Sequence, residues 1–118
     1  MSRKKILLVD DEREILLVLA EFLVDEGYDV KVAHSGLVAL DLFVEFKPDL
    51  VLSDNMMPFM SGVYLLQKFR NLPGFATTPF IIMSAAPLGQ NDQQIKPTEF
   101  LRKPFDADVV LKLVQKYA

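Results

Sequence analysis

The sequence predicts an α/β fold with a parallel sheet, because five short β-prone runs alternate with helix-like segments along the chain. The runs at residues 5–9, 50–53 and 80–83 are almost wholly apolar, as expected for strands that are covered on both faces. The run at 29–33 alternates in polarity and predicts an edge strand, and a weaker fifth run lies at 99–102. The pattern therefore predicts a (βα)₅ arrangement.

The helices between these runs have recognisable ends. Gly27 closes the first helix, and the second stops before Pro48. Ser35, Ser61 and Asp106 are predicted N-caps of later helices. The residues predicted to point into the core are Ile15, Leu19, Phe22 and Leu23, then Ala39, Leu40, Phe43 and Phe46, then Leu65, Leu66 and Phe69, and finally Val109, Val110, Leu113 and Tyr117.

The segment from residue 85 to residue 98 does not follow this pattern. It contains Pro87, Gly89 and Pro97, and its large apolar residues are Leu88 and Ile95 alone. Such a segment cannot form a long amphipathic helix. We therefore expect the fourth helix to be short or degraded.

Length and composition restrict the class of protein. A chain of 118 residues with 51% hydrophobic residues fits one domain, residues 1–118, with a core of its own. The absence of cysteine excludes disulfides and thiolate metal sites and agrees with a cytoplasmic location. No apolar run approaches the length that spans a bilayer, and the basic N-terminus is not followed by a signal-peptide core. A net charge of −3 argues against direct nucleic-acid binding. We expect no membrane insertion.

Three carboxylates are predicted to meet at one edge of the sheet. Asp10 and Asp11 directly follow the first apolar strand, and Asp54 directly follows the third. In an open parallel sheet, ligands bind beyond the carboxyl ends of the strands. Like charges about 4 Å apart cost on the order of 4 kcal/mol per pair at an effective dielectric near 20, so such a cluster requires a compensating cation or raised pKa values. All-oxygen ligation that leaves room for water favours Mg²⁺.

Each of these residues also has a purely structural interpretation. Asp10 and Asp11 alone would be a solvated acidic loop before a helix, and Asp54 alone would be a turn residue. Lys103, after the fifth strand, and Ser84, at the end of the fourth, would alone be a solvated lysine and a structural serine. Their common position at strand ends favours a single site, in which Lys103 pairs with a carboxylate and later with a phosphoryl oxygen.

Four motifs at the ends of four strands resemble those of the receiver domain of bacterial response regulators, including the single-domain chemotaxis type. They are Val9-Asp10-Asp11-Glu12, Ser53-Asp54-Asn55-Met56-Met57-Pro58 with Gly62, Ser84-Ala85, and Lys103-Pro104-Phe105. Each motif alone has little specificity, but the set in this order is specific and covers nearly the whole chain. The resemblance implies a flavodoxin-like three-layer sandwich with strand order 2-1-3-4-5.

The resemblance also implies an acidic site that holds Mg²⁺. Asp54 matches the aspartate that attacks a phosphoryl donor and forms an acyl phosphate, and it is also a metal ligand. Asp11 matches the direct carboxylate ligand of Mg²⁺, and Asp10 matches the one that acts through water. Met56 matches the residue whose backbone carbonyl is the third protein ligand, so its side chain is free to vary.

Three further residues match the switch of the family. Ser84 matches the hydroxyl that moves toward the phosphoryl group, and Lys103 matches the lysine that contacts it. Phe100 matches the aromatic switch residue but lacks the hydroxyl of a tyrosine. The family likeness also implies a cis peptide bond between Lys103 and Pro104. A second departure is the segment between Ser84 and Lys103, which is shorter than usual, so output is expected to use a different surface.

The function implied is that of a phosphoacceptor signalling domain in a two-component system or phosphorelay. Its partner would be a sensor histidine kinase or a histidine phosphotransfer protein, and its downstream protein target is not indicated. It would not be an enzyme beyond its own phosphorylation and dephosphorylation. One alternative is a pseudo-receiver that binds proteins without phosphorylation. An aspartyl phosphatase is disfavoured because Glu12 stands where a second aspartate is expected, and flavin binding is disfavoured because the acidic turn repels phosphate.

Overall fold

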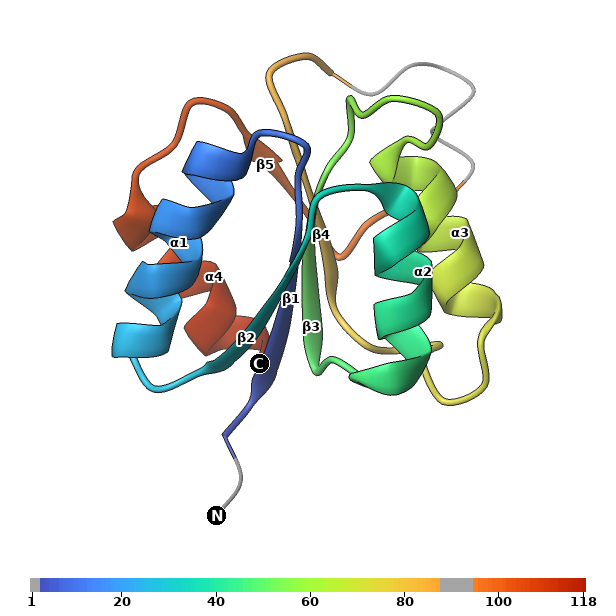
Figure 1. Ribbon diagram of the computed structural model, residues 1–118, viewed down its shortest axis with the longest axis horizontal. Coiled ribbons are helices and arrows are strands. Elements are labelled where there is room, and N and C mark those ends of the chain that lie inside the picture. Colours follow the sequence, from blue (N-terminus) through green and yellow to red (C-terminus); the bar gives the residue numbers. More distant parts are fainter. Residues whose placement is uncertain (1–2, 88–94) are drawn as a thin grey trace.

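The computed structural model describes residues 3–87 and 95–118 and contains a five-stranded parallel sheet (Figure 1). The strand order is β2-β1-β3-β4-β5, which confirms the flavodoxin-like order. The strands are β1 (Lys5–Val9), β2 (Asp29–Ala33), β3 (Leu50–Asp54), β4 (Phe80–Ser84) and β5 (Glu99–Arg102). The predicted edge strand, β2, lies at one edge of the sheet.

Helices cover both faces of the sheet, giving three layers. The helices of the described residues are α1 (Arg13–Asp25), α2 (Gly36–Glu45), α3 (Gly62–Asn71) and α4 (Ala107–Tyr117). Helices α1 and α4 lie on one face, and α2 and α3 lie on the other (Figure 1). Strand β1 shows why its run is apolar throughout. Leu7 and Val9 belong to the core under α2 and α3, while Ile6 and Leu8 belong to the core under α1 and α4.

Most predicted helix ends are confirmed. The hydroxyl oxygens of Ser35 and Ser61 accept hydrogen bonds from the third residue beyond each, at 3.3 and 3.1 Å. Gly27 follows α1 with a φ of 99°, a left-handed conformation that glycine adopts without steric cost. Asp106 occupies the N-cap position of α4, but its side chain makes no capping hydrogen bond.

Two of the residues predicted to be in the core are exposed, and four others are only partly buried: Phe22, Leu40, Leu113 and Tyr117. In α1, Ile15 is 45% exposed, and the neighbouring Leu16 is buried instead, in line with Leu19 and Leu23. In α4, Val109 is 42% exposed; the buried residues are Val110 and, four residues on, Val114, which had not been predicted. Consecutive apolar residues leave the phase of a helix undetermined in sequence, and packing on the sheet then selects one line of them.

The predicted weakness of the fourth helix concerns a segment centred on residues 88–94, which lie outside the described residues. The flanking residues 85–87 and 95–98 form bends and irregular structure. The prediction therefore stays untested. Among the helices that are described, the longest spans 13 residues, and none has the length and apolar character needed to cross a membrane.

Candidate functional site

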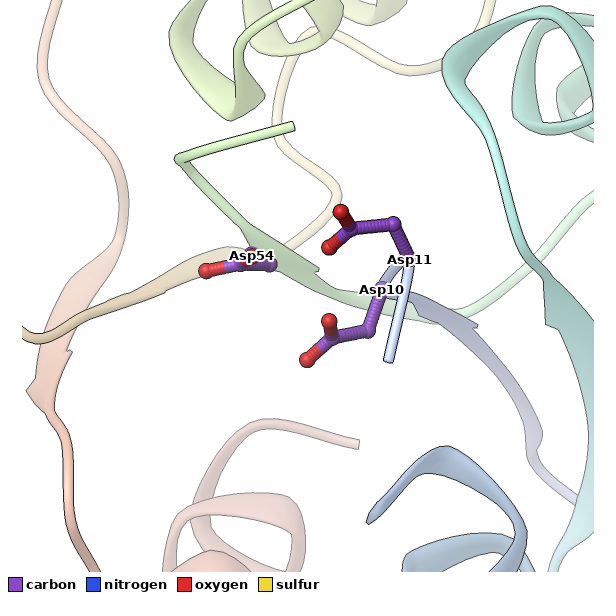
Figure 2. A group of neighbouring side chains, drawn as sticks. All are labelled: Asp10, Asp11 and Asp54. Carbon is purple, nitrogen blue, oxygen red and sulfur yellow. The ribbon is translucent and has the colours of Figure 1, made fainter. Parts of the chain in front are cut away.

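The three predicted carboxylates converge at the carboxyl edge of the sheet. Asp54 is the last residue of β3, and Asp10 and Asp11 directly follow β1, which pairs in parallel with β3 through Val9 and Ser53. One carboxylate oxygen of each aspartate lies within 4.8 Å of those of the others. Figure 2 shows the three side chains, with Asp10 and Asp11 from one turn and Asp54 from the neighbouring strand end. The adjacency of β1 and β3 produces this cluster.

The site is buried on one side and open on the other. Asp10 is 1% exposed and Asp54 5%, whereas Asp11 is exposed to solvent. One oxygen of Asp10 accepts a hydrogen bond from the backbone N–H of Glu12 at 3.0 Å. This bond fixes the turn that presents Asp11. The cluster can therefore receive a ligand from solvent while two of its carboxylates stay fixed.

Lys103 is the cationic partner of the two buried carboxylates. Its Nζ lies 3.0 Å from Asp10 Oδ2, to which it donates a hydrogen bond, and 3.3 Å from Asp54 Oδ1. The residue directly follows β5, and its backbone N–H donates to the carbonyl of Ser84 at 2.9 Å. The peptide bond between Lys103 and Pro104 is cis, as the family likeness implied.

The cluster of three carboxylates and one ammonium carries excess negative charge. Burial, and after it the charge of Asp10, raises the pKa of the Asp54 carboxyl above its ordinary value of 3.8, although Lys103 acts in the opposite direction. Burial by itself disfavours the Lys103 ammonium, but the hydrogen bond and charge of Asp10, followed by those of Asp54, raise the pKa of Lys103. Three carboxylates with one ammonium carry a net charge of −2 when ionised, so a divalent cation fits the donor set.

The loop between β3 and α3 is held tightly against Asp54. The Asn55 side-chain oxygen accepts a hydrogen bond from the N–H of Val63 at 3.2 Å, and the Asn55 carbonyl accepts one from the N–H of Gly62 at 3.1 Å. A Cβ atom at Gly62 would lie 2.6 Å from the carbonyl oxygen of Asp54. Asn55 was not assigned a role from the sequence. Only its place beside Asp54 and seven residues before the start of a helix could have indicated one.

Met56 lies in this loop with an exposed side chain, 68% accessible. An outward side chain agrees with the expectation that only the backbone of Met56 serves the site. The role of its carbonyl oxygen as a metal ligand stays a prediction.

Ser84 is the last residue of β4, which pairs with β3, and Phe100 lies on the edge strand β5. The buried Ser84 hydroxyl oxygen accepts a hydrogen bond from the N–H of Ala86 at 3.2 Å, so it is occupied within its own loop. No hydrogen bond among the described residues joins this hydroxyl to the carboxylates. Phe100, on β5 opposite Ile82, is 38% exposed. The switch roles of Ser84 and Phe100 stay predictions.

Known proteins resemble this chain in sequence over almost its whole length. The family model of the response regulator receiver domain matches residues 6–115. Sporulation initiation phosphotransferase F of Bacillus subtilis (strain 168) is 35% identical over 120 residues, which cover 99% of this chain and 95% of that protein. The chain spans about half the length of the probable transcriptional regulators ycf29 of Pyropia yezoensis and Porphyra purpurea, 51% and 54%, at 32% identity to each over 93% of this chain.

Solved structures agree. Chemotaxis protein CheY4 of Vibrio cholerae superimposes with a TM-score of 0.91 at 28% identity, covering 99% of this chain and all of the other. The receiver domain of the sensor histidine kinase PA1611 from Pseudomonas aeruginosa PAO1 shares the fold, with a TM-score of 0.87 at 24% identity over 98% of each chain. That structure has a magnesium ion coordinated in its active-site cleft. With its strand order, its acidic cluster and a family match over almost its whole length, the chain belongs to the response regulator receiver domain family.

Proposed function

We propose that this chain is a phosphoacceptor of a two-component system or phosphorelay, modified on Asp54 in a Mg²⁺-dependent reaction. The observation that carries the proposal is the convergence of Asp54 with Asp10 and Asp11, whose carboxylate oxygens lie within 4.8 Å of one another. The Lys103 ammonium forms an ion pair with the Asp54 carboxylate of this cluster. A receiver domain is a signalling domain rather than an enzyme that turns over a separate substrate, so the reaction proposed takes place on the chain itself.

The carboxylates would hold the metal. Asp11 would be the exposed direct ligand, Asp10 would act through water, Asp54 would supply a further oxygen, and the carbonyl of Met56 would complete the protein ligands. When bound, Mg²⁺ neutralises charge on the phosphoryl oxygens and on the carboxylates around them. The magnesium ion in the cleft of the PA1611 receiver domain supports this assignment.

The chemistry assigned to the chain's own residues is nucleophilic. A carboxylate oxygen of Asp54 attacks phosphorus, the bond between phosphorus and the donor breaks, and the donor leaves with the electron pair of that bond. A leaving imidazole of a protein donor takes its proton from solvent, whereas acetate leaves acetyl phosphate as the anion. The product is an acyl phosphate on Asp54. Lys103, 3.3 Å from the Asp54 carboxylate, is placed to pair with one phosphoryl oxygen as it arrives.

Signalling would follow from the added charge. The Ser84 hydroxyl, whose oxygen accepts from the N–H of Ala86, would move and donate its O–H to a phosphoryl oxygen, and Phe100 would turn inward beside it. The donor is a sensor histidine kinase or a histidine phosphotransfer protein, and the output is recognition of a protein target. Because kinases of this type are phosphorylated from ATP, the chain would act in the cytoplasm. The proposed function includes neither direct contact with nucleic acid nor insertion into a membrane.

Intact mass spectrometry tests the proposal. Incubation with acetyl phosphate and Mg²⁺ is expected to add one phosphoryl group to the unmodified chain and none to Asp54→Asn, and chelation with EDTA is expected to prevent the addition. A chain that folds and binds Mg²⁺ but gains no phosphoryl group would instead support a pseudo-receiver, which binds proteins without phosphorylation.

A further inference from the structure

Phe59 is presented to solvent by the same loop that anchors Asp54. Its side chain is fully exposed, at 105% of the reference accessibility, although aromatic side chains are usually at least partly buried. The loop joins β3 to α3 at the carboxyl edge of the sheet, where the turns after β1 and β5 also lie (Figure 1). The ring therefore stands on the edge that holds the acidic cluster.

The backbone at Phe59 is strained. Its φ of 68° is left-handed, a conformation that costs a bulky residue free energy that asparagine or glycine would not lose. The N–H of Met60 donates to the carbonyl of Pro58 at 2.8 Å, which closes a γ-turn around Phe59. No burial of the ring offsets this strain, so folding of this chain does not explain why position 59 is aromatic.

The loop beneath the ring is rigidly fixed. Met57 and Met60 point inward and pack against the core under α2 and α3, and Met60 sits so close to Gly36 that a Cβ atom there would meet its sulfur at 2.6 Å. On the other side, Gly62 packs on the Asp54 carbonyl. The backbone of Phe59 is thus held in one place at the site, so covering the ring costs only the freedom of its two side-chain torsions.

We propose that Phe59 is a docking anchor that inserts into an apolar recess of the protein that delivers the phosphoryl group to Asp54. The inference rests on the proposed function. A protein donor must bring phosphorus to the Asp54 oxygen and so must cover the strand-end edge on which Phe59 stands. Asp11 and Glu12 are exposed on the same edge, so the part of the donor surface around the recess must not be acidic.

Two phosphoryl donors separate docking from chemistry. The small donor is acetyl phosphate with Mg²⁺, which needs no docking. The protein donor is a purified sensor histidine kinase, autophosphorylated from labelled ATP and chosen because it labels the unmodified chain. The test variant is Phe59→Asn, since asparagine accepts the left-handed backbone, and Phe59→Leu keeps apolar bulk. The matched control is Val44→Asn, which removes another exposed apolar side chain, 56% accessible, near the far end of α2.

Phe59→Asn is expected to lower kcat/KM for transfer from the kinase at least about tenfold (about 1.4 kcal/mol), mainly through KM. Phe59→Leu should lose less, and Val44→Asn should lose nothing. Labelling by acetyl phosphate should stay within about twofold for all three.

Several outcomes would overturn the anchor. An equal loss of phosphorylation rate with both donors would show that the ring takes part in the chemistry. No loss of rate with the kinase would show that the ring does not dock. The anchor would also be wrong if acetyl phosphate labels the chain but no kinase does. A dimer of the unmodified chain that Phe59→Asn dissociates in sedimentation would assign the ring to a second copy instead. Failure of acetyl phosphate to label the unmodified chain would contradict the proposed function, and that result is distinct from all of these.

Discussion

Ionised Asp54 exists in this fold at a cost in free energy. The side chain is almost completely buried and lies beside Asp10, so burial and like charge both favour its protonated form, and Lys103 only partly compensates. A folded-state pKa above 3.8 means that Asp54 contributes stability below that pH, and that this contribution is lost as pH rises through the folded-state pKa. At neutral pH the unliganded site is therefore destabilising.

Asp54→Asn is accordingly expected to raise the free energy of unfolding at pH 7 in the absence of Mg²⁺, by on the order of 1 kcal/mol. Since both the folded and the unfolded chain protonate Asp54 in acid, the gain should shrink as pH falls toward about 4. Urea unfolding over this range measures it, with Asp41→Asn on the exposed side of α2 as a control. A gain that stays constant or grows in acid would contradict the assignment.

Lys103 competes with the metal for the same carboxylates. Its ammonium lies 3.0 Å from Asp10 and 3.3 Å from Asp54, so a divalent ion binds against its positive charge. Lys103→Met is expected to tighten Mg²⁺ binding on the order of tenfold and at the same time to slow phosphorylation by acetyl phosphate. Calorimetric titration at low ionic strength measures the first effect, with Lys112→Met as an exposed control. Weaker Mg²⁺ binding would show that Lys103 instead positions the carboxylates.

The contacts among the acids and Lys103 could be predicted from sequence. The acids follow two apolar strands, Lys103 follows the weaker fifth strand, and the ends of these strands share one edge of the sheet. The roles of Ser84 and Phe100 could not, since each also fits a structural position. Their assignment came from the family likeness. Asn55 was missed because its side chain acts on the backbone of Val63, and such a bond has no sequence signature.

The loop between β3 and α3 links the site to the helix that follows. Gly62 is the first residue of α3, and its α-carbon packs on the carbonyl of Asp54. Gly27, at the end of α1, differs from Gly62 because it is not crowded: a Cβ atom there would meet no neighbour within 4 Å. Its φ of 99° would nevertheless strain any residue with a side chain. One glycine is needed for space at the site and the other for backbone conformation far from it.

Replacement of each glycine by alanine should therefore have different consequences. Gly62→Ala is expected to lower the free energy of unfolding by about 1–3 kcal/mol and also to weaken Mg²⁺ binding, because relief of the clash moves Asp54. Gly27→Ala should lower stability by about 1 kcal/mol and leave Mg²⁺ affinity unchanged. Urea unfolding and calorimetry on both variants make the comparison. Equal loss of Mg²⁺ affinity in the two would show that general destabilisation, not displacement of Asp54, is the cause.

At the scale of elements, polarity patterns located all five strands within a residue, and serine caps located two helix starts. Polarity patterns did not predict which face of α1 and of α4 is buried. In both helices apolar residues are adjacent in sequence, and tertiary packing decides which of them is buried. The strand order does not follow from the alternation of strands and helices either, since several orders would bury the same apolar runs.

For the whole molecule, the central strands β1 and β3 both form the core and end in the acidic site. A cation bound there acts only on the folded chain, because unfolding separates Asp10 and Asp11 from Asp54, which is more than 40 residues away in sequence. Any favourable binding free energy therefore adds to the stability of the entire sheet.

Mg²⁺ at about 100 times its dissociation constant is thus expected to raise the free energy of unfolding by about 2.7 kcal/mol, which corresponds to roughly 10 °C in Tm for a domain of this size. Calorimetric melting with MgCl₂, against NaCl at equal ionic strength, measures the shift.

The shift in Tm should fall as pH drops through the raised pKa of Asp54, because protonation removes the charge of one metal ligand. This loss should begin at a higher pH than it would for an ordinary carboxyl group. Asp11→Asn should reduce it at every pH, because Asp11 is the exposed ligand and its loss leaves Lys103 bound to the two remaining acids. A shift equal in MgCl₂ and NaCl would mean that the cluster is screened by salt and not occupied by a specific ion.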